Sequence, residues 1–598
     1  MRSATRRHPV LAFVALGLAL AIFLIPLHFG GRDTLALTTA LVQAANGDSH
    51  TLNAPIILSE RPRVVLERGT VAIESGDKSA GLAALLKLLI DGRARLVIDN
   101  AVLSFDPAEI ASDAAGTVAP SAGPAEHPIL AALAGLNFEA LTIHQATLVR
   151  QSAAGAKSEL GTISADVTLK ARSIASAQGT FVRNGQTVAF DATLALPKGA
   201  KANARLPFRV GLKGLLLAAD FSGHLVRGRT VQIVASQSDI RTPDLKQLAE
   251  WLGAGSIASP GFNEFSAKGP FEWADGTLEF QPAQVVIDGN AASGSLSVQF
   301  GGERPSVEGT LDFANLELGS YVWDHRSNGI FALGAAWLPS IASEDSATSL
   351  IEAIDADLRI SAGRVSLRAA QVGHGAATLT VKRGRLNANI TDIELEQGGS
   401  GEGQIAIDMR GSVPRYDIRG ELRDVHAGEV SRALLGRTAI DGTATLSGHV
   451  TATGTTSRDM LSSLDGRIGL AVPNGAILGL DLEALLAMPK TPGAKGWGSA
   501  LSRTTAANAL TLRVMSANGV LSTETAELAT GAGQFTAAGT IDLRARALDV
   551  MLSRVWPADT AASEPQAVRI HGPLDKPEIT ATPNSNRADA AHRSQPPG

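Results

Sequence analysis

The sequence has no cysteine among its 598 residues. Disulfide frameworks, Cys-ligated zinc, iron–sulfur clusters and thiol catalysis are therefore excluded. A formal net charge of -5 provides no basic field for a polyanion, so nucleic acid is not expected as a partner. Aromatic residues make up only 4% of the chain, which leaves few large rings for a compact core. What is abundant is glycine, at 61 residues, and apolar residues at 44%, enough to build a sizeable core.

Catalytic signatures are also missing. The sequence contains no GxSxG, HExxH, Walker A, GxGxxG or calcium-loop spacing. His374 and His571 are the only histidines with suggestive glycine neighbours, and a turn or surface position explains both. We therefore predict no catalytic, metal-binding or cofactor-binding residue, no cofactor, and no enzymatic activity. An envelope hydrolase is disfavoured because no nucleophile and base can be named.

The N-terminal segment predicts a membrane anchor. No charge occurs from residue 9 to residue 31, and 23 residues are enough to span a bilayer. Arg2, Arg6 and Arg7 precede the span, so the positive-inside rule places residues 1–8 in the cytoplasm and the rest of the chain outside. A cleaved signal peptide is the alternative, but the apolar core exceeds the usual ~7 to 15 residues and no small-x-small site follows it at once.

Most of the exported body alternates apolar and polar residues in short runs separated by glycine, the pattern of half-buried antiparallel strands. The pattern is clearest over 376–410, where a turn is predicted at Arg383-Gly384. The predicted fold class is thus mostly β, a long twisted antiparallel sheet with a few short helices. The residues expected on its apolar face here are Leu379, Val381, Leu386, Ile390, Ile405 and Ile407.

A weak repeat indicates an array of similar units. Residues 294–318 and 403–427 each place a proline eleven residues after the opening glycine, at Pro305 and Pro414. The second half of each unit shifts phase by one residue, which moves side chains to the other face unless a bulge or strand end intervenes. We predict such irregularities at Phe313/Leu316, Leu422/Val425 and Ile390/Ile393.

Helical signals are few. In residues 242–253, Thr242 is the predicted N-cap, Pro243 lies in the first turn and Gly253 ends the helix. Other short helices are predicted at 80–90, 128–136, 428–436, 457–464 and 481–488, with a glycine-dependent turn before the last one. The regions expected along the chain are 1–8 cytoplasmic, 9–31 transmembrane, 32–255 N-terminal β, 256–425 central β-repeat, 426–582 C-terminal β, and 583–598 a disordered tail.

The predicted sheet has more apolar face than these helices can cover. Closure into barrels, pairing of two sheets as a sandwich, or a curved sheet filled by ligand would each hide that face. The scarcity of aromatic rings favours a smooth aliphatic groove suited to acyl chains, but the sequence pattern alone leaves these three outcomes open.

Three stretches of the C-terminal half carry a family resemblance. LSSLDGRIGLAVPNGAILGLDLEALLA (461–487), NGVLSTETAELATGAGQFTAAGTIDLRARALDVML (518–552) and VRIHGPLDKPEIT (568–580) resemble the C-terminal region of the AsmA family. The matching positions are Leu464, Gly466, Gly475, Ile477, Gly479, Asp481, Leu482, Gly519, Gly533, Gly539, Ile541, Asp542, Leu543, Leu548, Asp549, Gly572, Pro573, Leu574 and Pro577. The resemblance extends over most of residues 85–580, whereas residues 32–75 depart from the family's pattern.

The resemblance implies a single-pass inner-membrane protein whose periplasmic part is a taco-like β-sheet with an apolar groove, related to bridge-like lipid transfer proteins. It further implies a role in phospholipid transport between the inner and outer membranes and in outer-membrane assembly. The implied partners are phospholipids, the inner membrane through residues 9–31, and outer-membrane assembly factors. The alternative function is a structural or regulatory scaffold that influences the targeting and assembly of outer-membrane proteins.

Overall fold

The computed structural model describes residues 50–581 with gaps. The gaps are 52–55, 61–62, 75–92, 106–137, 152–156, 171–173, 196–203, 228–230, 253–256, 259–260, 301–303, 323–347, 368–369, 397, 436–437, 489–495, 498–499, 502, 532 and 556–566. The predicted span at 9–31, the predicted helices at 80–90 and 128–136 and the predicted tail at 583–598 lie outside the described residues.

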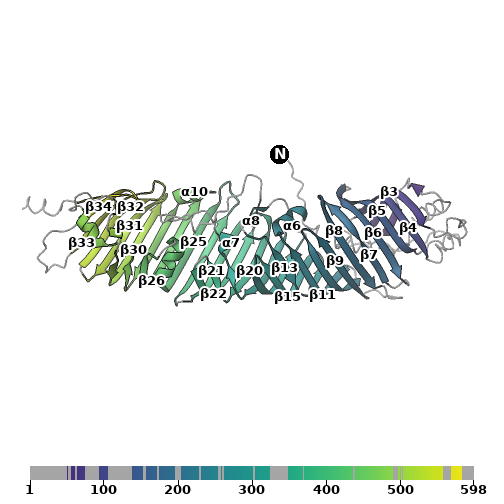
Figure 1. Ribbon diagram of the computed structural model, residues 1–598, viewed down its shortest axis with the longest axis horizontal. Coiled ribbons are helices and arrows are strands. Elements are labelled where there is room, and N and C mark those ends of the chain that lie inside the picture. The colour runs from purple at the N-terminus through teal and green to yellow at the C-terminus, as the bar shows by residue number, and fades with distance from the viewer. Residues whose placement is uncertain are drawn as a thin grey trace, which may run out of the picture. The chain divides into compact units, whose positions relative to one another are not determined.

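The contacts divide the chain into two units. The first comprises residues 1–257, 262–289 and 293–307, and the second comprises the remaining residues to Gly598. The boundaries placed near residues 255 and 425 from the sequence remain predictions. Each unit is built mainly of β-strands (Figure 1), so the predicted mostly β class with short helices is confirmed.

In its described residues the first unit has one helix and a series of strands in which alternate residues are buried. Its elements are β1 (His50–Thr51), β2 (Ile56–Glu60), β3 (Arg63–Glu74), β4 (Ala94–Phe105), β5 (Phe138–Gln151), β6 (Lys157–Lys170), β7 (Ile174–Arg183), β8 (Gln186–Ala195), β9 (Arg205–Gly214), β10 (Ala218–Arg227), β11 (Val231–Thr242), α6 (Leu245–Leu252), β13 (Phe265–Lys268), β14 (Phe271–Ala274) and β15 (Thr277–Ile287). Three strands lie across the division between the units: β12 (Ile257–Ala258), β16 (Asn290–Gln299) and β17 (Ser306–Phe313).

The second unit continues with strands of similar length and several short helices. Its elements are β18 (Leu316–Glu317), α7 (Gly319–Val322), β19 (Thr348–Ser349), α8 (Leu350–Ala353), β20 (Asp355–Ala362), β21 (Val365–Leu367), β22 (Ala370–Lys382), β23 (Arg385–Leu395), β24 (Ser400–Asp408), β25 (Arg415–His426), α9 (Ala427–Leu435), β26 (Ile440–Thr453), α10 (Ser457–Ser462), β27 (Asp465–Val472), β28 (Gly475–Ile477), α11 (Leu482–Ala487), β29 (Thr505–Ala507), β30 (Ala509–Ala517), β31 (Val520–Thr530), β32 (Gly533–Asp542), β33 (Ala547–Val555), β34 (Ala567–Pro573) and β35 (Glu578–Ala581).

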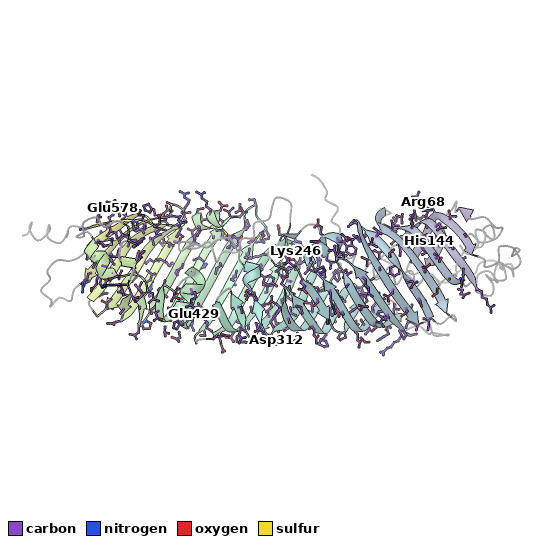
Figure 2. The ribbon with its side chains drawn as sticks, viewed as in Figure 1. Arg68, His144, Lys246, Asp312, Glu429 and Glu578 are labelled. Atoms are coloured by element: carbon purple, nitrogen blue, oxygen red, sulfur yellow. The ribbon has the colours of Figure 1, made fainter. Side chains whose placement is uncertain are left out.

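The predicted meander and its turn are confirmed. β22, β23, β24 and β25 pair in antiparallel succession, with Val381 opposite Leu386 and Ile407 opposite Tyr416. Arg383 and Gly384 connect β22 to β23 with φ of 51° and 81°, the left-handed pair that a tight hairpin needs. Alternation holds elsewhere too: Asp312, labelled in Figure 2, is exposed between two buried neighbours in β17.

The predicted phase shifts are confirmed at all three places. The β25–β26 ladder shifts register between Leu422 and Val425, and the β23–β24 ladder shifts between Ile390 and Ile393. At the third place β17 ends at Phe313 and β18 begins at Leu316. The chain therefore keeps its apolar residues on one face by inserting an unpaired residue or by ending the strand.

The expectation of a wholly antiparallel sheet is wrong at two pairings. β4 pairs with β5 in parallel, and β18 pairs with β21 in parallel. A parallel pair needs a connection long enough to return to the starting edge, and both pairs are separated by long stretches of chain. The sheet is thus mixed but largely antiparallel.

Four of the predicted helices appear as α6, α9, α10 and α11, but the N-cap assigned to the first is wrong. The Asp244 carboxylate accepts hydrogen bonds from the Lys246 and Gln247 amides at 3.0 and 2.9 Å, so Asp244 caps α6. The Thr242 hydroxyl accepts two residues earlier, from the amide of Asp244 itself, at 3.2 Å. An anionic cap is favoured at the positive end of a helix. The glycine-dependent turn before α11 is confirmed at Gly479, with φ of 71°.

Candidate functional site

The strand register of the second unit arranges the apolar face in transverse rows. In the first row Val381, Leu386 and Ile407 lie side by side, followed by Tyr416 and Ala452. Two residues along the strands, the second row contains Leu379, Ala388, Ile405, Ile418 and Val450. The predicted site residues therefore share one face, and they occupy three successive rows, since Ile390 lies in the third.

Helices cover one end of these strands. α10 follows β26 directly, and its Met460, which is 1% exposed, lies in one cluster with Ile407 and Tyr416 of the first row. Ile351 of α8 packs against the same cluster. α10 is held in place by a capping box in which Thr456 and Asp459 exchange hydrogen bonds. Ile407 is therefore buried in a cluster with Met460, and Val381 in the same row is equally buried, at 6% exposure, so neither is open to a ligand.

A second helical cap lies at the opposite end of the same strands. α9 follows β25 and packs Val430 against a cluster of Val425, Ala444 and Val472. Towards the C-terminus the face is closed by α11, whose Leu485 and Leu486 join a cluster with Phe535 and Ile570. The middle rows thus lie between helical rims.

We call these middle rows of half-buried residues the apolar band. Its members are Leu358, Ile360, Ala377, Leu379, Ala388, Ile390, Ile405, Ile418, Leu446, Ile468, Leu512 and Val514. From β20 to β27, every described position of these rows is aliphatic, alanine or glycine. The face is therefore uncharged hydrocarbon that its own unit leaves partly uncovered.

In the first unit the apolar face of the strands is more completely buried. In β8 the alternate residues Val188, Phe190, Ala192 and Leu194 are all buried, at 5% exposure or less. α6 packs Trp251 on Phe181 with ring centroids 6.3 Å apart, and the Trp251 ring N–H donates to the Arg183 carbonyl at 2.9 Å. Along β8 and α6, the apolar face of the first unit is therefore closed.

Four of the residues predicted from the sequence, namely Leu379, Leu386, Ile390 and Ile405, are half-buried and lie in the apolar band or at its margin. The members on β20, β25, β26, β27 and β30 were not predicted. The same period-two alternation marks those strands, so the signal was present. The sequence does not show the register that aligns these strands.

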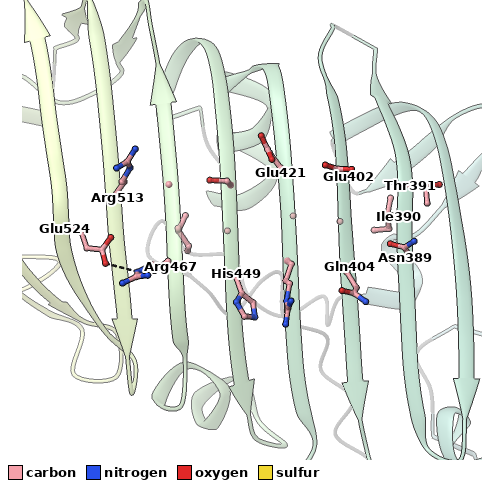
Figure 3. A pocket seen from close by; sticks show the side chains of 17 residues that line it. Asn389, Ile390, Thr391, Glu402, Gln404, Glu421, His449, Arg467, Arg513 and Glu524 are labelled. Atoms are coloured by element: carbon pink, nitrogen blue, oxygen red, sulfur yellow. Dashed lines mark hydrogen bonds and ion pairs between the residues drawn. The ribbon is translucent and has the colours of Figure 1, made fainter.

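The other face of the same strands carries a polar hollow of about 680 Å³ (Figure 3). Gln404, His449 and Arg467 lie along one side of it, and Glu402 and Glu421 lie along the other. These residues are one position out of phase with the apolar band, so they project from the opposite face. The hollow crosses the backbone of Gly403, Gly420 and Gly448.

Ion pairs balance the charges around this hollow. The Arg467 Nε donates to Glu524 at 2.9 Å, and His449 lies 3.1 Å from an Asp417 oxygen. Burial acts to raise the pKa of Asp417, but the hydrogen bond and charge of Arg419, with the charge of His449, leave that pKa below its usual value. The polar face is thus a solvated, charge-paired surface.

The exposed ion pair between Arg410 and Asp408 predicts that the folded protein loses stability in acid. The hydrogen bond from Arg410 lowers the pKa of Asp408 to about 2, below the ~3.9 expected for the unfolded chain. Between about pH 4 and pH 2 the folded state therefore binds fewer protons than the unfolded chain. The pair contributes its stability above that range, and this contribution is lost as the pH falls through it. Asp408→Asn should cost only ~0.2–1 kcal/mol because the pair is exposed. Melting temperatures measured from pH 7 to pH 2.5 should show the loss; a transition centred near pH 6 would instead implicate histidines.

No group of three or more His, Cys, Asp or Glu side chains in the described part of the chain is arranged to hold a metal ion. None of the helices that the structure describes has the length and apolar character to cross a membrane.

The fold and the apolar band define a β-sheet protein with an uncharged, partly open hydrocarbon face. The sequence model of the AsmA family matches residues 339–541, a range that includes β20 to most of β32 and hence the whole apolar band. The family resemblance predicted from the sequence is confirmed over this range. No curated protein and no solved structure gives a significant match to the chain.

Proposed function

We propose that the second unit shelters the acyl chains of phospholipids on the apolar band and lets them pass across its strands. The observation that carries this proposal is the apolar band itself: rows of aliphatic side chains, uncharged over β20–β27, that remain half-buried between helical rims. Contiguous apolar surface of this kind marks a site for a ligand, a partner or a membrane. The match to the AsmA family, which is linked to lipid transport and outer-membrane biogenesis, supports lipid as the ligand.

The physical mechanism is diffusive. Each methylene removed from water contributes about 0.8 kcal/mol, which offsets the cost of taking a chain out of a bilayer. Because neighbouring rows carry similar aliphatic residues, no single position holds a chain much more tightly than the next. The flanking helices keep the band from closing on itself.

The proposal also places the chain in the cell envelope. Residues 9–31 anchor the chain in the inner membrane with residues 1–8 in the cytoplasm, and the described units lie in the periplasm. From there the apolar band serves phospholipid transport between the inner and outer membranes and, through it, outer-membrane assembly.

Retention of lipid by the purified chain tests the proposal. We expect mass spectrometry of the full chain, extracted in mild detergent, to find phospholipid, and Leu379→Asp with Ile405→Asp to reduce it severalfold. Both side chains are half-buried, so the new carboxylates can reach water or a head group and the fold should survive.

Strand alternation supplies the control. Thr380→Asp with Gln404→Asp places the same charges one residue out of phase, on the polar face, and should leave bound lipid unchanged. An unmutated chain that carries no more lipid than the Leu379/Ile405 double variant would reject lipid as the ligand and favour the scaffold function.

A further inference from the structure

Two rows of like charges border the polar hollow. Arg419, His449 and Arg467 lie directly opposite one another on β25, β26 and β27 and form the basic row. Glu402 and Glu421 lie directly opposite each other on β24 and β25 and form the acidic row. Because Arg419 and Glu421 are two residues apart along β25, the rows are about 7 Å apart on one face of the sheet (Figure 3).

This segregation of charge does not stabilise the sheet. Like charges directly opposite each other on neighbouring antiparallel strands destabilise the pairing, and opposite charges stabilise it. If the residues at 419 and 421 exchanged places, opposite charges would face both His449 and Glu402. The fold therefore does not require the basic row and the acidic row, and their separation across a hollow points to a ligand.

Each row is anchored from the side away from the hollow. Asp417 accepts a hydrogen bond from Arg419 at 3.2 Å, and Arg423 donates to Glu421 at 2.7 Å. Arg423 also lies 3.7 Å from Glu402. Asp417 and Arg423 lie outside the two rows along β25, and neither lines the hollow. Charged groups that are fixed from behind in this way are positioned to meet a ligand in front.

We propose that the polar hollow binds an extended peptide segment in which acidic and basic residues alternate. Successive side chains of an extended chain point to opposite sides. A peptide lying along the hollow therefore turns its acidic side chains to the basic row and its basic side chains to the acidic row. The hollow crosses β23 to β27, about 19 Å by the usual strand spacing, which is the length of roughly six extended residues.

The remaining chemistry of the hollow favours a peptide over a lipid or a polyanion. Asn389, Gln404 and Ser447 line it with amide and hydroxyl groups that can donate to and accept from peptide bonds. A lipid in the hollow would leave its acyl chains in water, because the apolar band lies on the opposite face of the sheet. A polyanion attracted by the basic row would be repelled by the acidic row about 7 Å away.

Isothermal titration calorimetry of the full chain in mild detergent tests this proposal. The probes are three hexapeptides with blocked ends: alternating Glu and Lys, all Glu, and all Lys. We expect the alternating peptide to bind at low salt and each single-sign peptide to bind at least tenfold more weakly. Glu402→Gln with Glu421→Gln should reduce the affinity for the alternating peptide about tenfold, as expected for the loss of two exposed charge contacts.

An arginine outside the hollow provides the matched control. Arg569 donates to Asp549 at 2.8 Å and does not line the hollow, so Arg569→Gln should leave peptide binding unchanged. Arg419→Gln makes the same change in the basic row and should weaken binding severalfold. Both arginine side chains are more than half exposed, so both variants should keep their melting transition. Glu402→Lys with Glu421→Lys makes both rows basic and should transfer binding to the all-Glu peptide.

Several outcomes would overturn the peptide site. These are no binding of the alternating peptide, equal affinity for all three peptides, or unchanged affinity in the Glu402/Glu421 glutamine variant. Binding of glycerophosphoethanolamine in place of the alternating peptide would assign the hollow to a lipid head group instead. Leu379→Asp with Ile405→Asp, on the apolar face, should leave peptide affinity unchanged, so failure of the lipid proposal and failure of the peptide proposal are distinguishable.

Discussion

Ile407→Asp should unfold the second unit or lower its stability by about 4 kcal/mol or more, whereas Ile405→Asp should leave a folded protein. Ile407 is 6% exposed and packs in the cluster covered by Met460 of α10. The substitution removes the packing of the isoleucine and buries a carboxylate without a partner. Each effect costs several kcal/mol, which is a large part of the ~5–15 kcal/mol by which a domain is stable. Ile405 lies one row further along the same strand and is half-buried.

Thermal unfolding measures this difference. A cost of 4 kcal/mol corresponds to a fall in melting temperature of roughly 10 °C for a unit of this size. Ala406 lies between the two on the polar face, so Ala406→Asp should change the melting temperature little. Equal losses at positions 405 and 407 would mean that the apolar band is a dry core, and the proposed lipid path would have no room.

Gly466→Ala should destabilise the protein by about 2–4 kcal/mol, in contrast to a near-neutral Gly448→Ala. Gly466 has φ of 143°, and a Cβ there would lie 2.1 Å from the His449 carbonyl, so the β26–β27 ladder must shift to admit it. At Gly448 the nearest atom to a new Cβ is 3.5 Å away and φ is not positive. The two glycines lie on neighbouring strands of one face.

Melting curves of the two variants should differ by several degrees, with Gly448→Ala equal to the unmutated chain or slightly more stable because alanine restricts the unfolded chain. A large loss of melting temperature at Gly448→Ala would show that the backbone needs glycine there, contrary to the space available for its Cβ.

The turns and bulges of the sheet could be predicted from local sequence signals. The hairpin at Arg383-Gly384 needs left-handed backbone, and the phase shift from Leu422 to Val425 needs an unpaired residue, so each leaves a mark in a few neighbouring letters. The N-cap of α6 shows the limit of such signals. Thr242 and Asp244 can both accept from the first turn, and the choice depended on the exact start of the helix.

Which apolar residues remain accessible could not be predicted. Val381 and Leu379 are two residues apart with the same alternation, yet Val381 is buried and Leu379 is half-buried. The difference is one of tertiary packing, and nothing near Val381 in the sequence records which part of its face other segments cover. The row of Gly403, Gly420 and Gly448 has the same origin, since these residues meet only through the register of three strands.

The sequence by itself determined the β-rich class, the face of each residue, the positions of turns and bulges, and the family resemblance over residues 339–541, because these depend on period-two alternation and on short glycine-marked turns. The tertiary structure alone decided the two parallel pairings, the closing of the rows at both strand ends, and the open band between them. Those features depend on contacts between segments distant in the chain, where the burial of a side chain is set by what packs on it and not by its own position in a strand.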